Sequence, residues 1–232
     1  MRRIYTLSLT AALVALASTG WAQEAAKVAK GKAEPSKAGT WTIDPGHSSA
    51  SFEVRHMMVS TVQGRFSDVK GTIVLDEKNL AKSSIEAEIG VESVSTGNDK
   101  RDQHLKAKDF FDAKQFPKMT FKSSKVTKAD GGEFNVEGEL TIKGVTKPVT
   151  LKVTELTKPV KNPMAKGVMV RGARATTEID RTAFGLTWNK TMDKGGVVVG
   201  EKVKVTLDVE LQQAQGAAAA APKGAAAATP KK

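Results

Sequence analysis

The sequence predicts an all-β domain of about eight antiparallel strands, closed into a barrel, with a short helical segment at one end. Two observations lead to this fold class. Apolar and polar residues alternate with a period of two through most of residues 40–213, and a helix-like pattern is confined to one polar stretch after residue 97. Strands with one apolar face suit a sandwich or a barrel, and only a closed barrel leaves no unpaired sheet edge.

Residues 1–22 have the composition of a secretory signal peptide. Arg2 and Arg3 precede an apolar run over residues 4–17, and small residues precede a cleavage point after Ala22. The apolar run is shorter than the roughly 18–20 residues of a membrane-spanning helix. We therefore expect an exported protein, periplasmic or secreted. The chain has no cysteine, which excludes a disulfide, a thiolate metal site and a lipid-modified cysteine.

Two low-complexity segments flank the predicted domain of residues 40–213. Residues 23–39 and 214–232 are rich in Ala and Lys and lack the apolar variety of a core, so we interpret them as a linker and a tail. They are either solvated spacers or tethers that bring the protein into transient contact with an anionic surface such as a membrane. The net charge is +11, but residues 40–213 carry 27 Lys and Arg against 23 Asp and Glu. This near balance argues against nucleic acid as a partner.

The predicted strands follow one another along the domain. Each has one apolar and one polar face, and they cover residues 52–58, 69–75, 85–91, a stretch after Pro117, and then 134–142, 149–153, 168–179 and 203–211. Lys143 and Gly144 mark a tight turn. Glycines inside strands, such as Gly138 and Gly172, are interpreted as bends.

Residues 98–111 are the helical candidate. Asn98 or Asp99 would provide its N-cap, and the segment is expected to lie across one barrel end. It closes with Phe110 and Phe111, shortly before Phe116. Only 5% of the residues are aromatic, so this cluster outside the strands indicates an apolar site near the barrel end.

The motifs of the domain resemble those of the YceI-like family of bacterial lipid-binding proteins. The resemblance covers residues 40–213 and rests on ten segments in the family's order: Trp41-Thr42-Ile43-Asp44, His47-Ser48, Phe52-Glu53-Val54-Arg55-His56, Val62-Gln63-Gly64-Arg65-Phe66, Ser93-Val94-Ser95-Thr96-Gly97, Arg101-Asp102-Gln103-His104-Leu105, Asp109-Phe110-Phe111, Phe116-Pro117, Gly138-Glu139-Leu140-Thr141-Ile142-Lys143-Gly144-Val145-Thr146 and Ile179-Asp180-Arg181-Thr182-Ala183-Phe184-Gly185. It implies a lipocalin-like, extended barrel with a long apolar pocket. The pocket would hold a polyisoprenoid chain, such as the tail of a quinone or a prenyl phosphate, in a periplasmic or secreted protein.

An isoprenoid tail has few polar handles, so its site must be an apolar tunnel, which gains about 25 cal/mol per Å² of apolar surface removed from water. Any single apolar residue is as readily explained as ordinary core, but the set includes aromatic residues and an adaptable methionine. The candidate ligand-binding residues are Phe52, Val54, His56, Met58, Ile89, Val91, Phe110, Phe111, Phe121, Phe134, Leu140, Arg181, Phe184 and Trp188.

Polar residues leave alternatives for a head group. The spacing of His47, His56 and His104 does not match a zinc motif, so no metal site is predicted, although His56 or His104 can hydrogen-bond a quinone oxygen. Arg181 is either part of a turn or a phosphate partner at the pocket mouth. Three further arginines are cationic candidates: Arg55, Arg171 and Arg174.

Three hypotheses on function remain. The first is a carrier or store for an isoprenoid lipid, with no catalytic step and no cofactor. The second is an enzyme acting on such a lipid, or a metal-dependent hydrolase, that uses the histidines; no G-x-S-x-G nucleophile motif is present. The third is an envelope stress or structural protein tethered by its tails. The oligomeric state stays open, with a homodimer as one option.

Overall fold

The computed structural model describes residues 39–193 and 195–214. The predicted signal peptide and most of the linker and tail therefore lie outside the described residues. The strands are β1 (Gly39–Ile43), β2 (Ser49–His56), β3 (Ser60–Phe66), β4 (Val69–Leu75), β5 (Ser84–Gly90), β6 (Val94–Ser95), β7 (Lys118–Lys128), β8 (Phe134–Ile142), β9 (Val145–Leu156), β10 (Val160–Lys161), β11 (Val168–Asp180) and β12 (Val199–Ala214). One helix, α2 (Asp99–Lys106), and five 3₁₀ turns complete the described part: η1 (Pro45–His47), η2 (Leu80–Lys82), η3 (Val91–Ser93), η4 (Asp130–Gly132) and η5 (Arg181–Phe184). Within these residues, no helix has the length and apolar character to cross a membrane.

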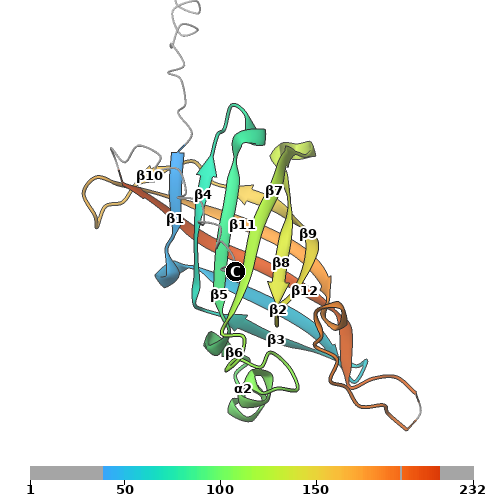
Figure 1. Ribbon diagram of the computed structural model, residues 1–232. Helices are drawn as coiled ribbons and strands as arrows, with labels where there is room; N and C mark the ends of the chain where they lie inside the picture. The colour runs from blue at the N-terminus through green and yellow to red at the C-terminus, as the bar shows by residue number, and fades with distance from the viewer. Residues whose placement is uncertain (1–38, 194, 215–232) are drawn as a thin grey trace, which may run out of the picture. The chain divides into compact units, whose positions relative to one another are not determined.

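Eight antiparallel strands close into a barrel. The ring runs β1–β4–β5–β7–β8–β9–β11–β12 and returns to β1 (Figure 1). Its longest ladder joins β11 to β12, from the pair Val168↔Ala214 to the pair Asp180↔Lys202. The predicted eight-stranded barrel is thus confirmed, and the sandwich is excluded.

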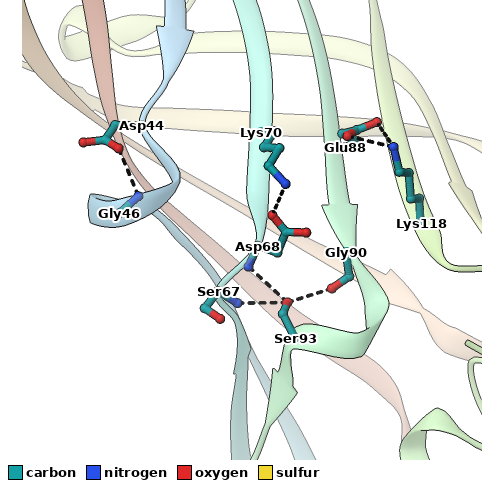
Figure 2. Close-up of polar contacts among 9 residues, drawn as sticks. All are labelled: Asp44, Gly46, Ser67, Asp68, Lys70, Glu88, Gly90, Ser93 and Lys118. Atoms are coloured by element: carbon teal, nitrogen blue, oxygen red, sulfur yellow. Dashed lines mark hydrogen bonds and ion pairs between the residues drawn. The ribbon is translucent and has the colours of Figure 1, made fainter.

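Three neighbouring strands of the barrel bend at the same level. β1 continues into β2, β3 into β4 and β5 into β6, each through a short break, so that β2, β3 and β6 extend the sheet beyond the ring. Ser93 holds one of these corners, because its hydroxyl accepts hydrogen bonds from the backbone N–H groups of Ser67 and Asp68 and donates one to the carbonyl of Gly90 (Figure 2). At the next corner, Ser48 accepts a hydrogen bond from the N–H of Glu210 on β12.

The polar faces of the strands carry ion pairs between neighbours. Lys118 on β7 lies 2.9 Å from Glu88 on β5 (Figure 2), and Arg174 on β11 lies 2.6 Å from Asp208 on β12. These exposed pairs contribute little to stability individually.

The predicted tight turn and the predicted helix cap are both present, and the helix is shorter than expected. Lys143 and Gly144 both have positive φ, 49° and 75°, as a two-residue hairpin turn requires. The side chain of Asn98 caps α2 by accepting from the N–H of Arg101. The helix was expected to reach Phe111 but ends at Lys106, because Ala107 takes an extended conformation and its N–H bonds to the carbonyl of His104.

Candidate functional site

A cavity of about 280 Å³ runs through the interior of the barrel. Its wall is apolar and takes side chains from every strand of the ring, because the inward positions alternate with outward polar ones. β12 shows this pattern directly, since Val203, Val205, Leu207, Val209 and Leu211 all line the cavity. The described lining residues include no histidine and no carboxylate.

The end of the cavity beside α2 is closed by aromatic residues. Leu105 from α2 and Phe110 and Phe111 from the turn after it line the cavity. Behind Phe110, two rings form a second layer: His104 lies at a centroid distance of 5.0 Å and Trp188 at 5.3 Å. The segment after α2 therefore forms the floor of the site, which agrees with its position in Figure 1.

Arg181 fixes the chain that flanks this floor. Arg181 is only 4% exposed, and its guanidinium donates hydrogen bonds to the carbonyls of Leu186, Trp188, Val199 and Gly200. Burial lowers the pKa of Arg181 from its usual value, and the nearby carboxylates raise it by a smaller amount. No carboxylate in the described part of the chain forms an ion pair with it. This side chain is a structural clamp, and Arg181 also lines the cavity.

At the opposite end, the cavity is bounded by aliphatic residues, among them Leu75, Leu80 and Leu156. Next to this end lies Arg171, which is 6% exposed and donates to Glu77 at 2.7 Å and to the carbonyl of Thr157 at 3.0 Å. The guanidinium also lies over the ring of Trp41. Arg171 is therefore committed to the protein itself.

Glycine makes room for an aromatic ring in the wall. Gly64 on β3 pairs with Phe52 on β2, and a Cβ at Gly64 would overlap the phenyl ring. Phe52 is the first of three aromatic rings in contact. The ring centroids of Phe52 and Phe66 are 5.7 Å apart, and Phe66 contacts Phe111 edge to face at a centroid distance of 5.5 Å. The extension strands and the floor are thus packed against each other through aromatic contacts.

Nine of the fourteen predicted site residues line the cavity: Phe52, Val54, Ile89, Phe110, Phe111, Phe121, Phe134, Leu140 and Arg181. They are spread over β2, β5, β7, β8, η5 and the turn after α2, so the fold does bring them together.

His56 and Met58, which the sequence placed on the same strand face as Phe52 and Val54, do not line the cavity. His56 is the last residue of β2, lies opposite Val199 across a register shift in β12, and is not among the residues that line the cavity. Met58 lies in the turn after β2 with a positive φ of 62° and is 58% exposed. The strand was expected to reach residue 58, but it ends at His56.

Three others pack outside the cavity wall, two of them buried and Trp188 half-buried. Val91 was expected on the inner face of β5, but the strand ends at Gly90 and Val91 begins η3, where it is 1% exposed in the core. Phe184 is 3% exposed and packs in η5. Trp188 contacts Phe110 and His104 from behind.

The three histidines lie in different surroundings. His47 hydrogen-bonds Asp44 at 2.7 Å, and these two residues with Glu210 form the only group of potential metal ligands in the described residues. The group stands at the corner between β1 and β2, where Asp44 caps η1 and accepts from Gly46 (Figure 2), so capping explains its geometry. His104 instead contacts Asp109, and His56 belongs to the end of β2. No two histidines share one metal-type cluster in the described chain.

Sequence reasoning missed most of the small aliphatic wall. Ala87, Ala173 and Ala175 line the cavity and leave its space open, as do valines such as Val136 and Val205. The period-two alternation contained the signal, because these residues occupy the same faces as the predicted ones. They were not among the candidates, because the candidates were chosen largely for their aromatic character.

The comparisons with known proteins agree with one another. A model of the YceI-like domain matches residues 41–211. A UPF0312 protein of Staphylococcus aureus is 38% identical over 170 residues, which cover 73% of this chain and 95% of the relative. The crystal structure of BcnA from Burkholderia cenocepacia is 27% identical and matches with a TM-score of 0.61 over 72% of this chain and 98% of that one.

Two further solved structures share the fold. The YCEI protein of Campylobacter jejuni is 30% identical, with a TM-score of 0.57 over 69% of this chain and 90% of that one. A domain from Saccharophagus degradans, described as polyisoprenoid binding and implicated in plant cell wall breakdown, is 15% identical. It matches with a TM-score of 0.53 over 76% of this chain and 99% of that domain, a likeness of fold.

Proposed function

The chain belongs to the YceI-like family, and from this premise we propose that it is an exported protein that holds an isoprenoid lipid in its barrel for transport or storage. The apolar cavity carries this proposal. A hydrocarbon chain gains about 0.8 kcal/mol for each CH₂ group that leaves water. The description of the Saccharophagus degradans domain as polyisoprenoid binding supports the same class of ligand.

The arrangement of the arginines supports a ligand whose buried part is hydrocarbon alone. Arg171 and Arg181 are committed to protein acceptors, Arg174 pairs with Asp208, and Arg55 donates to Thr61 and to the carbonyl of Met58. A quinone or phosphate head group would then lie beyond the wall of the cavity, with the isoprenoid tail inside. The proposal includes no catalytic step and no cofactor, in keeping with a wall without histidine or carboxylate in the described residues.

Mass spectrometry tests the proposal. The protein would be purified from its native envelope without detergent, and its organic extract would be analysed for bound lipid. A stoichiometric isoprenoid is the expected result, and its head group would distinguish a quinone from a prenyl phosphate. A protein that yields no isoprenoid, and that also fails to bind prenyl lipids in vitro, would contradict it.

A further inference from the structure

A basic and apolar hairpin extends the barrel beyond one end of the cavity. Leu156, the last residue of β9, lines the cavity, and residues 157–167 follow it directly. In this segment β10 pairs with the start of β11, through Val160↔Val170 and Lys161↔Met169. The hairpin lies at the end of the barrel away from α2 (Figure 1), which is the end that lacks the aromatic floor.

The side chains of this hairpin are exposed and of two kinds. Met164 is 92% exposed and Val160 is 57% exposed, the first of these being the most exposed large apolar residue in the described chain. Around them lie Lys158, Lys161 and Lys166, all exposed, and no acidic residue occurs between positions 157 and 167. None of these three lysines forms an ion pair within the described residues, whereas Lys118 and Lys122 on the barrel wall do.

The hairpin is ordered by its own hydrogen bonds. Asn162 donates its N–H to the carbonyl of Val168 at 2.9 Å and accepts from the N–H of Met164 at 2.8 Å. At the base, the Thr157 hydroxyl accepts from the N–H of Gly172, and the Thr157 carbonyl accepts from Arg171. The apolar side chains are therefore held outward by a preorganised backbone, which reduces the entropy lost on docking.

We propose that residues 157–167 dock the protein on an anionic lipid bilayer, with the Leu156 end of the cavity toward the lipid. Exposed apolar side chains enter the boundary of head groups and acyl chains, while lysines extend to the anionic head groups. An anionic bilayer fits this hairpin better than an acidic protein does. The bilayer offers negative charge to the three lysines and an apolar phase to the two exposed apolar side chains, whereas the carboxylates of a protein would satisfy only the lysines. The inference deepens the proposed function, on which it rests, by naming the surface from which the lipid is taken.

The turn between β2 and β3 provides the matched control. Met57, Met58 and Val59 are also exposed, at 45%, 58% and 77%, but the turn itself has no lysine. The nearest cation along the chain, Arg55, is engaged with Met58 and Thr61. If exposed apolar surface alone determined docking, this turn would serve as well as the hairpin.

The experiment is co-sedimentation of the full chain with vesicles. Vesicles of phosphatidylcholine with phosphatidylglycerol are expected to bind the protein at low salt, and vesicles of phosphatidylcholine alone to bind it weakly. The triple variant Lys158→Gln, Lys161→Gln, Lys166→Gln should weaken binding at least about tenfold, because each lysine contributes at an anionic surface. The pair Val160→Ser, Met164→Ser should also weaken it, while Met58→Ser, Val59→Ser should leave it unchanged.

Each outcome decides the proposal. The proposal is overturned if both hairpin variants bind as wild type does, or if only the Met58 and Val59 variant loses binding. The lysine-rich segments 23–39 and 214–232 are the same in all of these proteins, so they cannot cause a difference between them. Thermal unfolding checks that the variants are folded. Binding of a soluble short prenol, measured without vesicles, separates the two proposals: hairpin variants should retain it. If no protein binds the prenol but the hairpin still governs sedimentation, the proposed lipid carrier fails and the docking surface stands.

Discussion

The phenyl ring of Phe121 on β7 occupies the space above Gly138 on β8. A Cβ at Gly138 would lie 2.5 Å from the Phe121 ring and 2.5 Å from the carbonyl oxygen of Lys122. Phe121 lines the cavity, so the absence of a side chain at Gly138 leaves room for a ring of the cavity wall. The sequence predicted a bend at this glycine, and the structure shows that it makes room for a neighbouring ring.

Gly138→Ala should destabilise the barrel by about 1–3 kcal/mol, because the new methyl group overlaps both the ring and backbone that cannot move freely. Gly172→Ala is the control: its Cβ would meet nothing closer than 3.6 Å, so its free energy of unfolding should stay within about 0.5 kcal/mol of wild type. Urea unfolding measures both. Equal effects of the two substitutions would show that the Phe121 contact is not the cause.

Arg181→Met should lower the free energy of unfolding by at least about 3 kcal/mol, because four backbone carbonyls lose a charged donor in a buried site. Arg174→Met removes an exposed ion pair with Asp208, whose side chains are 50% and 57% exposed, and should cost less than about 1 kcal/mol. Thermal or urea unfolding again serves as the measurement. A mild effect at position 181 would mean that residues 186–200 hold their place without the clamp.

Ala87→Phe should fill part of the cavity and reduce isoprenoid binding, since Ala87 lines the wall and a phenyl group would compete with the ligand for the same space. Thr72→Phe on the adjacent strand β4 adds the same group at an exposed position and should bind as wild type. Binding of a fluorescent polyene lipid gives the affinities. Unchanged binding by a folded Ala87→Phe protein would place the ligand elsewhere.

The corner between β1 and β2 should respond to pH through Asp44 and His47. The hydrogen bond from His47 lowers the pKa of Asp44 below 3.8, and the same bond to Asp44 raises the pKa of His47 above 6.5. A lowered carboxyl pKa contributes stability above its unfolded value and loses it as the pH falls through the folded value. A raised imidazole pKa contributes stability that is complete below 6.5 and is lost as the pH rises through the folded value.

The pair should therefore stabilise the corner most between the two ordinary pKa values, 3.8 and 6.5. The variant His47→Gln should not show the loss of stability that the wild type shows as the pH rises through the pKa of His47. Its melting temperature should be lower than that of the wild type mainly at acidic pH. Melting curves across this range test it, and NMR titration of His47 tests the direction of its pKa directly. A difference between wild type and variant that is the same at every pH would contradict the assignment.

The sequence predicted the fold because period-two alternation is a local property. Phe52 and Val54 face inward as the alternation requires, and the turn at Gly144 follows from two adjacent residues. Val91 was placed on the wrong element because its strand ends at a corner, and Ser93 holds that corner through contacts with residues more than twenty positions away. A period of two contains no information about such long-range contacts.

The role of Arg181 was one of two alternatives left open by the sequence, and the structure favours the turn over the phosphate partner. Its four acceptors are backbone carbonyls, which have no signature in a single sequence. The shift in register between β2 and β12 is equally hidden, because it depends on how two distant strands align. Local pattern thus predicts the wall of the cavity and the aromatic segment that forms its floor, and contacts between distant segments determine where the strands end.

The pairing of β1 with β12 has a consequence for the order of folding. Thr42 lies opposite Gln212, so the ring closes only when its last strand meets its first. Such contacts have the greatest sequence separation in the domain and slow folding. A circular permutant that joins residue 214 to residue 39 by a short loop, and opens the chain at Lys143–Gly144, would turn this closure into a local hairpin. The longer β8–β9 ladder, from Phe134↔Val153 to Ile142↔Val145, then joins the two ends of the chain. We therefore expect the permutant to keep the same barrel and to refold more slowly than the natural chain.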